Sequence, residues 1–195
     1  MKLPELIKSF EDQEVLPIDV NDILLKLREA GNDDDIEFVG VDLDPEVLLG
    51  AIRIFYVRNG VYADPKRFVN IYYDRTRTVD WQRMVCCKEL VHILDPETAH
   101  TKLAAEIDLL AERIGLPPEM QDPAADGFAT NIDRMAEYRA AALLLPMAAR
   151  ELLMPKIRDG SLKIADVAKL ADMPTKYAGF VLNDVWETVY PLLTR

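Results

Sequence analysis

Residues 80–94 read DWQRMVCCKELVHIL and have the pattern of a single helix. Asp80 is a residue type that caps helices, because its side chain accepts hydrogen bonds from the unpaired N–H groups of the first turn. The Asp95-Pro96 pair ends the pattern, because proline disfavours the helical conformation of the residue before it. We therefore predict a helix across this stretch, with the motif KELVH, residues 88–92, near its C-terminal end.

The sequence changes character on either side of this helix. Three earlier segments are rich in β-branched and aromatic residues and predict strands: residues 36–43, 51–57 and 68–73. Helical spacing of apolar residues occurs once before the strands and five times after the motif: residues 18–30, 103–114, 131–145, 146–160, 164–172 and 175–190. Because most helices follow the strands, we predict an α+β fold with a small, mainly antiparallel N-terminal sheet and a helical bundle that carries the motif helix.

The composition limits the class of protein. The chain has 195 residues, half of them hydrophobic, and a formal net charge of −11 from 23 basic and 34 acidic residues. Its length predicts one domain over residues 1–195, in which residues 161–195 form a helical pair packed on the rest. The acidic balance argues against a basic surface for nucleic acid or anionic lipid.

Several features predict a cytoplasmic protein without membrane association. The first ten residues lack the apolar run of a signal peptide, and the most apolar stretch, residues 140–149, is too short to span a bilayer. The two cysteines, Cys86 and Cys87, are adjacent, so they do not make a disulfide framework. We interpret them as packing residues, with a reactive or metal-binding role as the alternative.

The motif at residues 88–92 differs by one position from the H-E-x-x-H pattern of zinc peptidases. In that pattern two histidines four residues apart share a helix face and bind one ion, and the glutamate takes a proton from the metal-bound water. Here Glu89 and His92 are in place, whereas Lys88 occupies the position of the first histidine. So short a match is also typical of an ordinary amphipathic helix, in which His92 would be structural.

Residues 137–146, EYRAAALLLP, resemble the block of a glutamate followed by Leu-Leu-x-Pro in the ImmA/IrrE group of zinc metallopeptidases. The order of segments is similar as well: a small sheet with a substrate-aligning edge strand, the motif helix, this block and a short helical pair over residues 164–174. The resemblance implies a zincin-like fold in which Glu89 is the general base and His92 and Glu137 are zinc ligands. It also implies a regulatory role, because better-known members cleave or inactivate a helix-turn-helix repressor, often in mobile elements or stress responses.

Lys88 changes the chemistry that this resemblance implies. An ammonium group cannot ligate a metal, and the pKa of lysine, about 10, would have to fall by several units to free its lone pair. Lys88, His92 and Asp95 share one helix face, and we expect Glu137 to face them from a later helix. We predict that Lys88 neutralises these carboxylates in place of the metal, that zinc is absent or weakly bound, and that hydrolysis is lost or weakened.

Other interpretations stay open. The chain could be an active zinc endopeptidase with an atypical metal site, or a non-catalytic module that holds an extended peptide along its edge strand. Glu137 could equally pair with Arg134 or Arg139 on the surface. DNA binding by the C-terminal helices is disfavoured, since residues 155–195 hold six basic and five acidic residues, a net charge of only +1. We expect a protein or peptide partner rather than nucleic acid.

Overall fold

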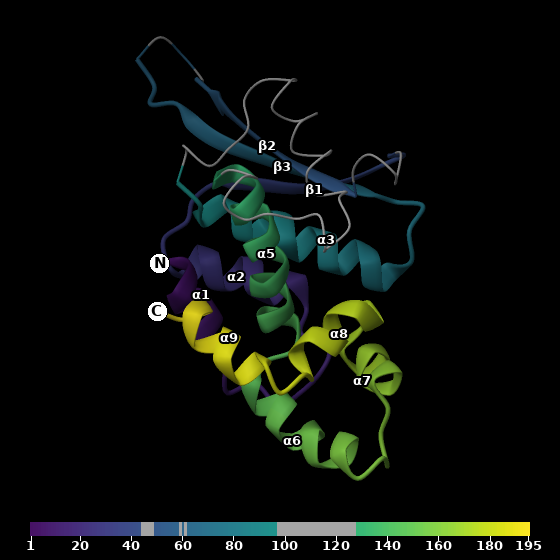
Figure 1. Cartoon of the computed structure of the whole chain (residues 1–195). Helices are drawn as coiled ribbons and strands as arrows, with labels where there is room; N and C mark the ends of the chain where they lie inside the picture. The colour runs from purple at the N-terminus through teal and green to yellow at the C-terminus, as the bar shows by residue number, and fades with distance from the viewer. Residues whose placement is uncertain (44–48, 59, 61, 97–127) are drawn as a thin grey trace.

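The computed structural model describes residues 1–43, 49–58, 60, 62–96 and 128–195. In this part of the chain a three-stranded sheet and eight α-helices make an α+β fold, as predicted (Figure 1). The helix predicted over residues 103–114 lies outside the described residues. None of the described helices is long and apolar enough to cross a membrane.

The sheet is mixed rather than mainly antiparallel. Its strands are β1 (Asp35–Val41), β2 (Gly50–Val57) and β3 (Lys66–Asp74), in the order β1-β3-β2. β2 and β3 follow each other in the chain and pair antiparallel, so β2 occupies one edge of β3. β1 pairs with the other edge and runs parallel to β3. This second pairing joins residues that are distant in the sequence, so the local alternation of apolar residues did not predict its direction.

One face of the sheet lies on helices. α3 (Val79–Val91) packs against β2 and β3, and α2 (Val20–Glu29) packs against α3 on the same side of the sheet (Figure 1). The inward side chains line up across the strands: Val69 of β3 lies between Ile36 of β1 and Ile54 of β2. Val69 is fully buried. Apolar burial on this face therefore fixes α3 beneath the sheet.

The motif helix begins slightly earlier than the sequence predicted. Its N-cap is Thr78, with extended backbone angles, and Asp80 lies in the first helical turn instead. A carboxylate in that turn interacts favourably with the helix dipole. At the other end the chain tightens into a 3-10 turn, η1 (His92–Leu94), so His92 lies where α3 passes into this turn.

α5 (Phe128–Leu144) crosses α3 and makes its main helical contact there (Figure 1). It begins before Asn131, the residue predicted to cap it, and ends just before Pro146. Pro146 is the N-cap of α6 (Met147–Arg158), because a proline at this place needs no helical hydrogen bond for its nitrogen. The described part of the predicted bundle therefore has α3 and α5 at its centre.

Residues 161–195 form three short helices instead of a pair: α7 (Ile164–Ala171), α8 (Thr175–Val181) and α9 (Trp186–Leu193). The additional break falls at Asn183. Its side-chain Oδ1 accepts a hydrogen bond of 2.9 Å from the backbone N–H of Val185, which turns the chain before α9. α8 packs on both α7 and α5, so these C-terminal helices reach the centre of the bundle.

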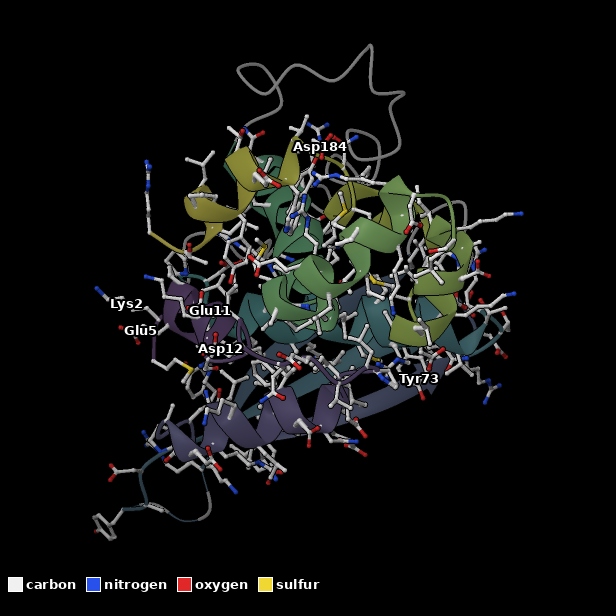
Figure 2. The ribbon with its side chains drawn as sticks, turned by 90° about the horizontal axis from the view of Figure 1, so that it is seen from below. Lys2, Glu5, Glu11, Asp12, Tyr73 and Asp184 are labelled. Atoms are coloured by element: carbon white, nitrogen blue, oxygen red, sulfur yellow. The ribbon has the colours of Figure 1, made fainter. Side chains whose placement is uncertain are left out.

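The N-terminal helix α1 (Leu3–Lys8) lies close to α9 in Figure 1. The hydroxyl of Tyr190 donates a 3.3 Å hydrogen bond to Oε2 of Glu11, which joins the two ends of the chain. Seen from below, Glu11 lies beside Asp12 at this end of the molecule, and Tyr73 lies at the opposite end (Figure 2).

Candidate functional site

Two helices from distant parts of the sequence, α3 and α5, cross at the motif that carries most of the predicted site residues. α3 and η1 carry Lys88, Glu89 and His92, and α5 crosses them. Glu89 and His92 are buried. Gly50 at the start of β2 allows this arrangement, because a Cβ atom there would overlap Cγ1 of Val85 on the preceding turn of α3.

Lys88 lies between two carboxylates. Its Nζ is 2.6 Å from Oδ1 of Asp133 on α5 and 3.4 Å from Oε1 of Glu89. The side chains of Lys88 and Asp133 are only 18% and 12% exposed. Water therefore screens this ion pair much less than a surface pair, and each charge depends on the other for its stability.

The ionisation of this pair follows from the geometry. Burial alone lowers the pKa of Lys88, but the negative charges of Glu89, Asp133 and Glu137 outweigh it and hold the pKa above its ordinary value. Burial alone raises the pKa of Asp133, but Lys88 and His92 lower it to about 2. Both groups are therefore charged at neutral pH.

His92 has a carboxylate at each ring nitrogen. Nδ1 lies 2.7 Å from Oδ2 of Asp95, and Nε2 lies 3.4 Å from Oδ1 of Asp133. A ring that donates to acceptors on both sides must carry both protons. Although burial lowers the pKa of His92, the hydrogen bonds to Asp133 and Asp95 raise it to about 9.

These contacts make one charge cluster, which consists of Lys88, Glu89, His92, Asp95, Asp133 and Arg139. Arg139 closes the series, with Nη1 3.5 Å from Oδ1 of Asp95. Cations and anions alternate along it, and the charges of three cations and three anions sum to zero. A balanced cluster of this kind holds several charges out of water without a bound ion.

Glu137 lies outside the closest contacts of the cluster. Its Oε2 is 3.7 Å from Nζ of Lys176 on α8. Its charge and a hydrogen bond also raise the pKa of Tyr177, after the larger effect of burial. Glu137 therefore joins α5 to the start of α8, and Lys88 is affected by it only as a more distant charge.

The residue that sequence reasoning missed is Asp133. It lies one turn before Glu137, and residues four apart on a helix share a face. That spacing could have suggested Asp133 as the carboxylate facing the motif, but the resemblance directed attention to Glu137. The crossing of α5 over α3 decides between them, and it brings Asp133 to Lys88 and His92.

The residues of the cluster do not fit a zinc ion in their present arrangement. The ammonium group of Lys88 lies 2.6 Å from Oδ1 of Asp133, where it repels a cation and has no lone pair to offer. Across the described residues, no group of three or more His, Cys, Asp or Glu side chains is arranged to hold a metal. Cys86 and Cys87 are free and buried, and burial raises the pKa of Cys86 to about 12.

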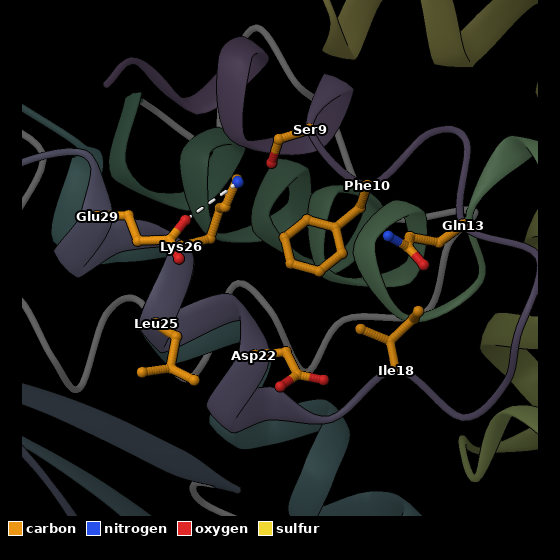
Figure 3. A pocket seen from close by; sticks show the side chains of 8 residues that line it. All are labelled: Ser9, Phe10, Gln13, Ile18, Asp22, Leu25, Lys26 and Glu29. Carbon is orange, nitrogen blue, oxygen red and sulfur yellow. Dashed lines mark hydrogen bonds and ion pairs between the residues drawn. The ribbon is translucent and has the colours of Figure 1, made fainter.

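A pocket of about 280 Å³ lies elsewhere, between the end of α1 and α2 (Figure 3). Its lining mixes apolar and polar side chains: Ser9, Phe10, Gln13, Ile18, Asp22, Leu25, Lys26 and Glu29. Lys26 and Glu29 pair with each other at 3.1 Å. The pocket shares no residue with the charge cluster, and the hydroxyl of Ser9 in its lining donates a 2.7 Å hydrogen bond to the backbone oxygen of Leu6.

Comparison of the chain with family models, with curated proteins and with solved structures gave no match.

Proposed function

We propose that this chain is a non-hydrolytic or weakly hydrolytic relative of the ImmA/IrrE zinc peptidases that acts by binding a protein or peptide. The observation that carries the proposal is the position of the Lys88 amine, 2.6 Å from Asp133 and 3.4 Å from Glu89. The positive charge of the amine lies among the carboxylates, where a zinc peptidase would place the charge of its metal ion.

The position of Glu89 supports a loss of hydrolysis. In a zinc peptidase the glutamate of the motif accepts a proton from a water molecule that the metal has made acidic. Here Glu89 is buried beside Lys88, and no group of the cluster could make a water molecule comparably acidic. Glu89 therefore serves to balance charge rather than to act as a general base.

The sheet supports a binding role. β2 is an edge strand antiparallel to its neighbour, and among the described strands it pairs only with β3. α3 packs closely beneath it at Gly50. An extended peptide that added to this edge by main-chain hydrogen bonds would lie near the motif helix and would require no metal. By the resemblance, a helix-turn-helix repressor is the first partner to test.

The experiment compares wild-type protein with Glu89→Gln, each mixed with candidate repressors in the presence and absence of added Zn²⁺. Co-elution measures binding, and intact mass measures cleavage. We expect one repressor to bind both proteins equally and to stay uncleaved. Zinc-dependent cleavage by the wild type that Glu89→Gln abolishes would contradict the loss of hydrolysis. Failure of every repressor to bind would contradict the proposed partner.

A further inference from the structure

The pocket between the end of α1 and α2 has an apolar floor. Phe10 and Ile18 are buried, and Figure 3 shows the ring of Phe10 in the middle of the lining. Leu25 adds a third apolar side chain, which is about half exposed. The volume of about 280 Å³ lies just below the range of about 300–1,000 Å³ typical of pockets for drug-sized ligands. The pocket therefore suits a single side chain rather than a cofactor.

The polar side chains of the lining leave one negative charge without a counter-charge. Nζ of Lys26 lies 3.1 Å from Oε2 of Glu29, so these two charges balance each other. Among the described residues no basic side chain forms an ion pair with Asp22, the other acid of the lining. Gln13 adds an amide oxygen, which accepts hydrogen bonds. A ligand that matches this lining carries a positive charge and hydrogen-bond donors.

The chain around the pocket has the same preference. Residues 9–25 contain five acidic residues and no basic one: Glu11, Asp12, Glu14, Asp19 and Asp22. The negative potential of such a segment attracts cations and repels anions. A free amino acid would bring its own α-carboxylate close to these acids. The same side chain within a protein brings only an uncharged backbone, so it is the better match.

We infer that this pocket binds an arginine side chain of a partner protein. The aliphatic part of arginine can lie on the apolar floor while its charged end reaches Asp22. The guanidinium group stacks on aromatic rings and has five N–H donors, which suits Phe10, Asp22 and Gln13. Lysine lacks this planar group. The inference goes beyond the proposed function and does not depend on it, because the pocket shares no residue with β2 or with the charge cluster.

The test is an NMR titration of the ¹⁵N-labelled full chain with N-acetyl-arginine amide. We expect saturable shifts of the backbone amide signals of Phe10, Gln13 and Leu25. Asp22→Asn should weaken binding at least about fivefold, because it removes the charge that pairs with the guanidinium group. Glu14→Gln is the matched control, since it removes one acid of the same segment from outside the lining. It should change the affinity by less than about twofold.

Citrulline tests the charge in the wild type, because it has nearly the shape of arginine but a neutral end. N-acetyl-citrulline amide should bind at least about fivefold more weakly than N-acetyl-arginine amide, and Asp22→Asn should remove this difference. Equal binding of the two compounds to the wild type would overturn the inference. Equal weakening by Asp22→Asn and Glu14→Gln, or no saturable shift at the pocket, would overturn it as well.

Free arginine distinguishes a partner protein from a small metabolite as the source of the side chain. We expect free arginine to bind more weakly than N-acetyl-arginine amide, because the acidic segment repels its α-carboxylate. Tighter binding of free arginine would contradict the assignment to a partner protein.

Discussion

Nζ of Lys88 lies 2.6 Å from Oδ1 of Asp133, across the contact between α3 and α5. The same oxygen lies 3.4 Å from Nε2 of His92, so one carboxylate is shared by two cations of the motif. This sharing makes the packing of α5 on α3 depend on charge as well as on apolar contact. We therefore expect the free energy of unfolding, and its dependence on pH, to change when residues of the charge cluster are substituted.

Lys88→Met should strongly destabilise the fold. Methionine keeps the length of the side chain but leaves Asp133 and Glu89 buried without their counter-charge, at a cost of about 3–5 kcal/mol in the free energy of unfolding. The matched control is Lys66→Met, because Lys66 pairs with Asp35 at 3.1 Å with both side chains about half exposed. That change should cost less than about 1 kcal/mol. Urea unfolding measures both changes. If Lys88→Met and Lys66→Met lowered the free energy of unfolding equally, the Lys88 ion pair would be no stronger than a surface pair.

Stability should fall as pH rises above neutrality, because the pKa of His92 is raised from 6.5 to about 9 in the folded chain. Its protonated form stabilises the fold fully below its unfolded pKa, and this contribution disappears as pH passes through about 9. The loss should be on the order of 2–3 kcal/mol between pH 6 and pH 10. Urea unfolding across this range measures it, and His92→Gln should have a flatter profile. Identical profiles for the two proteins would contradict the protonated state.

Gly50→Ala should destabilise the protein by about 1–3 kcal/mol, because the added methyl group would overlap Val85 and force α3 away from β2. Gly179→Ala is the control, since the nearest atom to its new Cβ, Cγ2 of Ile164, lies at 3.9 Å. Gly179 lies within α8, so alanine there should raise stability by up to about 1 kcal/mol. Thermal unfolding distinguishes the two variants. If Gly50→Ala left the stability unchanged, the close approach of α3 to β2 at Gly50 would not be required.

The two thiols should react slowly in the native protein. Burial raises the pKa of Cys86 to about 12 and raises that of Cys87 further, so little thiolate exists at pH 8. We expect a thiol reagent to modify both at least about tenfold more slowly in the native protein than in urea. Rapid modification of the native protein would instead support the alternative that the sequence left open, a reactive role for Cys86 and Cys87.

The local pattern of the sequence predicted much of the fold. The strands and the motif helix lie within a few residues of their predicted positions, because alternation and helical spacing are local properties. The parallel pairing of β1 with β3 was not predicted, because it depends on contacts between distant residues. The break at Asn183 was missed as well, since it depends on one side-chain hydrogen bond.

The candidate site was predicted in part. The spacing of Lys88, His92 and Asp95 indicated a shared face, and the structure places His92 and Asp95 in contact. The sequence did not indicate that Asp133, rather than Glu137, contacts the motif. Both residues lie on one face of α5, and only the crossing of α5 over α3 distinguishes them. The contact of Arg139 with Asp95 depends on the same crossing.

The most direct test of whether the Lys88 ammonium group takes the place of a zinc ion is the zinc content of wild-type protein purified without chelators, with His92→Gln prepared in parallel. If the ammonium group occupies the place of the ion, elemental analysis should find far less than one zinc ion per chain in both proteins. One tightly held zinc ion per chain in the wild type, lost in His92→Gln, would contradict the account.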